Sequence, residues 1–168
     1  DGRAVSGPNT ATGYMTQQDS LLPWRTAAAN IGLPLVLRHA PQAAIDARVA
    51  EMLALVGLRN FGGHFPGELS GGMKKRVALA QILSYDPPTL LMDEPFGALD
   101  AQLKLLMQEE LLRIWEGAKK TIVFVTHDLA EAITMSDRVV VFSSRPGRIK
   151  AIESIKLPRP RDPLYVQF

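Results

Sequence analysis

The chain has 168 residues, the size of a single domain, and hydrophobic residues make up 46% of it. Charged residues contribute 21%, so the composition suits a protein with a buried core and excludes a disordered tail. The absence of cysteine excludes a disulfide scaffold, a cysteine-ligated zinc site and a thiol nucleophile. The apolar runs are far shorter than the roughly 20 residues of a membrane-spanning helix.

The net charge of +2 is unevenly distributed along the chain. Residues 1–137 carry a net charge of −3, whereas residues 138–162 carry +5. A basic stretch can contact nucleic acid or a membrane surface, but the solvated face of a closing hairpin is the simpler interpretation.

The first 37 residues predict turns, one short strand and one short helix. Residues 1–13 are rich in Gly, Ser, Thr and Asn and are typical of the end of a hairpin. A short strand is expected at residues 14–17 and a loop with Pro23 at residues 20–24. Residues 26–37 are apolar and Ala-rich, but Gly32 and Pro34 predict a short helix followed by a break.

Two stronger helices are expected next. Residues 41–56 form an amphipathic helix that ends at Gly57, with an inward face of Ile45, Val49, Met52 and Val56. Ser70 caps a second helix that runs to about Ser84, with Val77, Ala78, Ile82 and Leu83 at its apolar positions. Residues 86–88, Asp-Pro-Pro, end this helix. Residues 20–84 are therefore almost wholly helical and are expected to form a separate lobe.

The last 80 residues alternate between strand and helix signals. Residues 89–92 and 121–125 are apolar and are expected to be strands buried in a parallel sheet. A third strand is expected at residues 138–142, and a returning strand at 148–157 follows a turn at 145–147. Helices are expected at residues 101–116 and 128–135, and the inward positions of the first are Leu103, Leu106, Met107, Leu111 and Ile114. This order indicates an α/β fold with a mostly parallel sheet.

Several polar residues stand where such a sheet binds ligands. Asp93 and Glu94 follow a buried strand, so one carboxylate could hold Mg²⁺ while the other faces an attacking water. They could equally just favour the start of the next helix. Ser70 and the two glycines after it could cradle a phosphate, or simply begin a helix. His127 could contact a phosphate or lie on the surface, and Gln17 carries little information alone.

Taken together, these segments resemble the nucleotide-binding domain of an ABC transporter over nearly the whole chain. The resemblance rests on the order of Gln17, LSGGM at 69–73, LLMDEP at 90–95, GALD at 97–100 and His127. LLPWRT at 21–26 and SDRVVVFSSRPGRI at 136–149 resemble the branch that imports nitrate, sulfonates and taurine. The implied fold is an α/β fold of the P-loop NTPase type, with a partial, mostly parallel sheet and a helical lobe.

The resemblance also implies a role for each motif in binding and hydrolysing ATP with Mg²⁺. Gln17 would contact Mg²⁺ or the attacking water, Asp93 would support Mg²⁺, and Glu94 would be the general base. His127 would contact the γ-phosphate. The ATP held by a second subunit of a head-to-tail dimer would be contacted by Ser70, Gly71, Gly72, Met73 and Asp100.

The implied partners are a transmembrane permease subunit, a second ATP-binding subunit and, indirectly, an extracellular or periplasmic solute-binding protein. In the family, the lobe that contains residues 21–24 receives the permease. The implied location is peripheral, on the cytoplasmic face of the cell membrane, and the implied cargo is a small anion such as sulfonate, taurine or nitrate. We expect no nucleic-acid partner.

The sequence departs from the family pattern in one major respect, because no Gly-Lys-Ser/Thr of a P-loop occurs in it. Together with the start at Asp1, this predicts a partial ATPase domain that lacks roughly 70 upstream residues and is inactive alone. Residues 1–19 would be the remnant of an N-terminal hairpin and the Gln17 loop, residues 20–84 the helical lobe, and residues 85–168 the catalytic lobe. Gln81 stands where the family often has Arg, and Lys74 and Lys75 replace frequent Gln residues; we expect these changes to tune function.

Two alternatives stay open at this point. The chain could be a catalytically incomplete interaction module that lends its LSGG motif to an intact partner, although such a module would not need Glu94 and His127. It could also be an ABC-type ATPase that acts on DNA or ribosomes, although the sequence has neither heptads nor a second copy of the domain. An in-frame Gly-Lys-Ser/Thr upstream in the gene would argue against the module.

Overall fold

The structure is a computed structural model that describes residues 7, 11–17, 20–97, 99–118, 120–159 and 161. The chain divides into two units, Asp1–Val125 and Thr126–Phe168. The first unit contains β1 (Thr12–Met15), α1 (Ala27–Leu37), α2 (Gln42–Leu55), the 3-10 turns η1 (Arg59–Phe61) and η2 (Pro66–Glu68), α3 (Gly71–Ser84), β2 (Thr89–Asp93), α4 (Ala101–Ala118) and β3 (Thr121–Val125). The second contains α5 (Leu129–Met135), β4 (Arg138–Phe142) and β5 (Ile149–Ser154). None of the described helices is long and apolar enough to cross a membrane.

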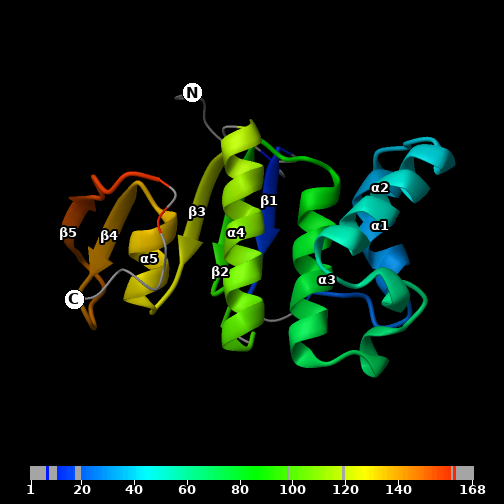
Figure 1. The fold of residues 1–168 in the computed structure, drawn as a ribbon, viewed down its shortest axis with the longest axis horizontal. Coiled ribbons are helices and arrows are strands. Elements are labelled where there is room, and N and C mark those ends of the chain that lie inside the picture. The colour runs from blue at the N-terminus through cyan, green and yellow to red at the C-terminus, as the bar shows by residue number, and fades with distance from the viewer. Residues whose placement is uncertain are drawn as a thin grey trace. The chain divides into compact units, whose positions relative to one another are not determined.

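A parallel sheet lies in the first unit, with β2 between β1 and β3 (Figure 1). Leu90 and Met92 of β2 are buried, which confirms the predicted central strand. The predicted burial of β3 is wrong, because Val123 and Val125 are 53% and 60% exposed. Within the described sheet β3 pairs with β2 alone, so it is an edge strand.

The helices α1, α2 and α3 pack against one another, and α3 also contacts β1 (Figure 1). The predicted break in α1 is wrong, since the helix continues through Gly32 and Pro34 to Leu37. Gly32 allows a close approach to α2: a Cβ atom there would lie 3.1 Å from a methyl group of Ile45 and 3.2 Å from one of Val49. The glycine thus serves helix packing.

Pro34 is accommodated by a side chain from another helix. A proline inside a helix removes the hydrogen bond to the carbonyl group four residues earlier, which here belongs to Asn30. The Nε2 atom of Gln81 on α3 donates to that carbonyl oxygen at 2.8 Å. The lost backbone bond is therefore replaced from α3, and α1 continues.

The other helices of the first unit follow the sequence pattern more closely. The inward positions predicted for α2 are buried, and Gly57 follows the helix at a positive φ of 66°. Met107 and Leu111 of α4 are buried, but Leu106 is 52% exposed, so its predicted inward position is wrong. The buried stripe runs along Met107, Gln108 and Leu111, and Leu106 lies beside it. The side chain of Ile114 lies outside the described residues.

In the second unit, β4 and β5 form an antiparallel pair of their own. The predicted returning strand is thus confirmed, with β5 shorter than expected, while in the described structure β4 pairs with β5 and not with the parallel sheet. The predicted turn at residues 145–147 lies between the two strands.

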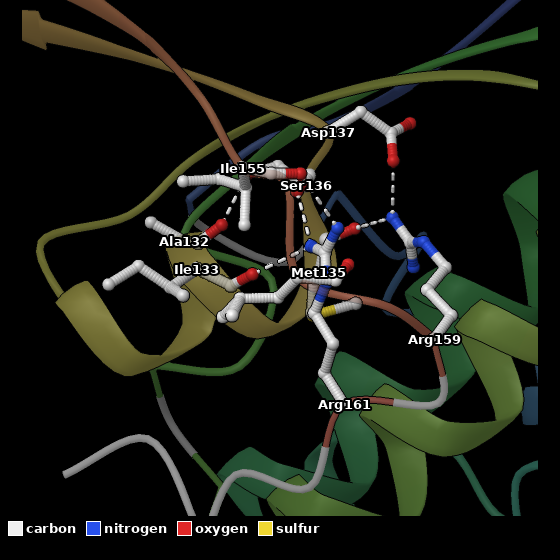
Figure 2. Close-up of polar contacts among 9 residues, drawn as sticks. Ala132, Ile133, Met135, Ser136, Asp137, Ile155, Arg159 and Arg161 are labelled. Carbon is white, nitrogen blue, oxygen red and sulfur yellow. Dashed lines mark hydrogen bonds and ion pairs between the residues drawn. The ribbon is translucent and has the colours of Figure 1, made fainter.

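Two arginines of the basic C-terminal stretch bond the end of α5 (Figure 2). Arg161 donates to the carbonyl oxygens of Ile133 at 2.8 Å and Ser136 at 2.6 Å, and Arg159 donates to that of Met135 at 2.9 Å. Burial, and then the neighbouring charge of Arg159, lowers the pKa of Arg161. Both side chains therefore neutralise the carbonyl end of a helix, where cations are favoured.

Candidate active site

Glu94 lies directly after the central strand, at the carboxyl edge of the parallel sheet. Its backbone N–H donates to the Val125 carbonyl oxygen at 2.9 Å and so extends the pairing of β2 with β3. Its φ of 46° is in the left-handed region, which a residue with a side chain seldom adopts. Such strain gathers at functional sites, and here it sets the direction in which the carboxylate leaves the strand. Asp93, the last residue of β2, is half-buried beside it.

Gln17 reaches this carboxylate from the neighbouring strand. It follows β1 closely, and its Nε2 atom donates to Glu94 Oε2 at 3.3 Å. β1 and β2 are parallel, so their carboxyl ends meet at one edge of the sheet. The structure therefore brings together two predicted site residues that are 77 positions apart.

The donor atoms at this edge suit a magnesium ion. Asp93, Glu94 and Gln17 offer carboxylate and amide oxygens, the ligands that Mg²⁺ prefers. Among the described residues there is no cluster of three or more His, Cys, Asp or Glu side chains that could hold a metal ion. Mg²⁺ commonly binds through one or two carboxylates, with waters and phosphate oxygens completing its shell, so these residues fit a nucleotide-bound Mg²⁺ better than a metal cage built from the protein alone.

The predicted phosphate-binding motif opens α3. The Ser70 side chain accepts a hydrogen bond from the Met73 N–H at 3.2 Å, which confirms Ser70 as the N-cap. Ser70 and Gly71 are exposed, and a Cβ atom built on Gly71 would have nothing within 4 Å. The start of α3 is thus open on this side, with N–H groups at the positive end of a helix.

Asp100 directly precedes α4 and interacts with α3. Its Oδ1 atom accepts from the Leu103 N–H at 3.0 Å, as an N-cap does. Burial lowers the pKa of Arg76 on α3, and the negative charge of Asp100 partly opposes this. Asp100 therefore links the loop after Glu94 electrostatically to the helix that begins at Gly71.

His127 belongs to the second unit, where a hydrogen-bonded turn surrounds it. Thr126 Oγ1 accepts from the Asp128 N–H at 3.0 Å and contacts the buried carboxylate of Glu131. Asp128 Oδ1 in turn caps α5 by accepting from the Ala130 N–H at 2.9 Å. His127 is exposed in this turn.

Two structural residues near the predicted motifs had not been identified as site residues from the sequence. Lys75 is buried on α3, and its Nζ donates to the carbonyl oxygens of Thr16 and Gln17. Lys75 lies on the same face of α3 as the buried residues Ala78, Leu79 and Ile82. A charged residue on this apolar face is the sequence feature that could have identified Lys75.

The other is Asn30, which holds the loop of residues 22–26. It is fully buried, and its Oδ1 accepts from the Leu22 N–H at 2.8 Å. Its Nδ2 donates to the carbonyl oxygens of Leu22, Arg25 and Thr26 at 3.0–3.1 Å. These bonds fix a loop whose Trp24 is 71% exposed.

A comparison with protein families finds that residues 3–97 match the family model described as ABC transporter. The chain is 48% identical over its whole length to an uncharacterized ABC transporter ATP-binding protein of Methanocaldococcus jannaschii, covering 63% of that protein. It is 47% identical over 90% of its length to a taurine import ATP-binding protein of Rhizobium johnstonii, covering 58% of it. An aliphatic sulfonates import ATP-binding protein of Bacillus cereus is 44% identical over 96% of the chain, which covers 63% of it. The chain thus spans about three fifths of the length of these curated relatives.

Solved structures give the same picture. The dimeric structure of a post-hydrolysis state of an ATP-binding cassette bound to ADP and Pi superposes with a TM-score of 0.79 at 32% identity. The match covers 86% of this chain and 63% of that one. A dimeric bacterial ABC transporter cassette superposes equally well, at 33% identity. The predicted fold class, α/β of the P-loop NTPase type, is confirmed.

Proposed function

This chain belongs to the ABC transporter family, and we propose that it serves in the ATP-binding and ATP-hydrolysing subunit of an importer for a small anion. The observation that carries the proposal is the contact between Gln17 and Glu94 at the carboxyl edge of the sheet. A carboxylate that can accept a proton and an amide that can orient a water meet there.

In the proposed reaction, Glu94 is the general base. It accepts a proton from a water molecule whose oxygen attacks the γ-phosphorus of ATP, and ADP is the leaving group. Gln17 holds the carboxylate and the water in one orientation. Asp93 would help to hold Mg²⁺, which when bound neutralises charge on the phosphates. His127 would donate a hydrogen bond to the γ-phosphate.

The motif at residues 70–73 acts on a second nucleotide in this proposal. The exposed start of α3 suits the γ-phosphate of ATP held by another ATP-binding subunit, and Asp100 would lie at the same dimer interface. The structural neighbours are dimers, which supports this arrangement.

The partner that receives the energy would be a transmembrane permease on the cytoplasmic face of the membrane. The Asn30-anchored loop supports this assignment because it presents Trp24 outward from a fixed backbone. Taurine, alkanesulfonates and nitrate are the proposed cargo class, and the names of the relatives support taurine and aliphatic sulfonates. A solute-binding protein would deliver the cargo to the permease.

The test of catalysis is phosphate release by the protein expressed from its complete gene, with Mg²⁺ and ATP. Glu94→Gln is expected to lower kcat by about 100-fold or more, because it removes the general base. Glu116→Gln, an exposed site on α4, is the matched control and should leave kcat unchanged. A Glu94→Gln variant with the kcat of the control would refute the assignment.

The test of transport is uptake of labelled taurine or an alkanesulfonate by cells that carry or lack the gene. Uptake lost with the gene and not restored by Glu94→Gln supports the importer. Full ATPase activity, with unchanged uptake of taurine, an alkanesulfonate and nitrate when each is tested in the same way, would instead favour an ABC-type ATPase with another task. No ATPase activity would favour the interaction module.

A further inference from the structure

Lys75 is a buried cation whose side chain is directed at the backbone that carries Gln17. The residue is 8% exposed. Its Nζ donates to the carbonyl oxygen of Thr16 at 3.2 Å and to that of Gln17. Burying an ammonium group is costly unless hydrogen bonds replace its lost water, and these two carbonyl groups supply such bonds.

The contact acts on a residue that is itself in contact with the catalytic carboxylate. Lys75 holds the carbonyl group of Gln17, while the side chain of Gln17 donates to Glu94 at 3.3 Å. That distance is already long for a hydrogen bond, so a small backbone shift at residue 17 would break the contact.

The same helix carries the motif that opens with Ser70. Lys75 follows Ser70 by five residues, or about 7.5 Å along α3 at 1.5 Å per residue. A displacement of the start of α3 is therefore carried along a rigid helix to the Lys75 ammonium group, and from there to the backbone of Gln17.

We infer that Lys75 is a positioning residue that holds Gln17 against Glu94 and couples the start of α3 to the catalytic carboxylate. The inference rests on the proposed function of Gln17 and Glu94. In a dimer of such subunits, the start of α3 contacts one nucleotide and Gln17 serves the other, so Lys75 links the two sites.

The experiment measures ATP hydrolysis by Lys75→Met in the protein from the complete gene. Methionine keeps a long side chain and removes the donors. Lys150→Met, which removes the same charge at an exposed position of β5, is the matched control. Lys75→Arg tests rescue, and the double variant Lys75→Met with Gln17→Ala tests whether Lys75 acts through Gln17.

We expect Lys75→Met to lower kcat about tenfold or more with little change in KM for ATP, because a displaced positioning group impairs the chemical step. Lys150→Met should match the unaltered protein, and Lys75→Arg should retain most of its kcat. In the Gln17→Ala background, Lys75→Met should change kcat by less than about twofold. If Lys75→Met equals the Lys150→Met control, or keeps its full effect without the Gln17 side chain, the inference is overturned.

A second readout does not depend on ATPase activity. Amide hydrogen exchange at residues 16 and 17 should speed up in Lys75→Met and not in Lys150→Met. Unchanged exchange there contradicts the inference even if the protein hydrolyses ATP. Faster exchange in a protein without ATPase activity would still show that Lys75 holds this backbone, and would refute only the proposed function. If Lys75→Met fails to fold, Lys75→Gln replaces it in both comparisons.

Discussion

Replacing Gln81 by methionine should destabilise the protein through a carbonyl group on a different helix. Gln81 Nε2 donates to the carbonyl oxygen of Asn30, which Pro34 leaves without its helical N–H partner. Asn30 is fully buried, so water does not replace the lost donor. Methionine has the length of glutamine but no N–H group, and the unpaired acceptor should cost about 1–3 kcal/mol of unfolding free energy.

The assay is urea unfolding followed by far-UV circular dichroism. Gln102→Met, on the exposed face of α4, is the control and should change the free energy of unfolding by less than about 0.5 kcal/mol. Pro34→Ala restores a backbone N–H opposite the Asn30 carbonyl group. In that background, Gln81→Met should cost at least about 1 kcal/mol less than in the unaltered protein, because the acceptor has a new partner. An equal loss in both backgrounds would refute the explanation for the continuous α1.

Three other changes test the packing of α1 against α2, the hydrogen bonds at the end of α5, and the titration of Tyr85. Gly32→Ala should cost a net of about 1 kcal/mol in urea unfolding, because its Cβ would lie 3.1 Å and 3.2 Å from two methyl groups of α2 and this overpacking should outweigh the roughly 1 kcal/mol that Ala gains over Gly inside a helix. Gly63→Ala, with nothing within 4 Å, should cost little. Arg161→Met should speed amide exchange in α5, because the carbonyl groups at its end lose their donor, and exchange equal to that of the exposed-site variant Arg148→Met would contradict this role. Burial raises the pKa of Tyr85 in the folded protein. The stabilising contribution of the neutral Tyr85 phenol is therefore complete below about pH 10 and is lost as the pH rises through the folded pKa. In thermal unfolding across this pH range, Tyr85→Phe should lose less stability than the unaltered protein as the pH rises. Equal losses in the two proteins would refute the raised pKa of Tyr85.

Those parts of the fold that depend on local signals were predictable from the sequence. The Ser70 cap, the period of α2 and the apolar run of β2 each involve residues close together in the chain. The continuous α1 was not predictable in this way, because the side chain that compensates for Pro34 lies 51 residues after Asn30. The exposure of β3 was missed for a related reason, since an apolar run does not say how many neighbours a strand has.

In the candidate site, too, some features follow from local sequence motifs and others only from contacts between distant residues. Gln17 and Glu94 could each be identified from its motif, and parallel strands explain why they meet. The left-handed backbone of Glu94 leaves no mark in residue type, because the residue there is not a glycine. Lys75 was detectable as a charge on an apolar stripe, but its partners follow only from the packing of α3 against β1.

The most direct test of the central claim, that Glu94 drives ATP hydrolysis at this edge of the sheet, is the identity of the nucleotide that the protein retains. The protein from the complete gene is incubated with Mg²⁺ and ATP, separated from free nucleotide, and its bound nucleotide is analysed by chromatography. The account predicts ADP on the unaltered protein and intact ATP on Glu94→Gln, because that variant keeps binding but loses the base. ADP on both proteins in equal amounts would contradict it.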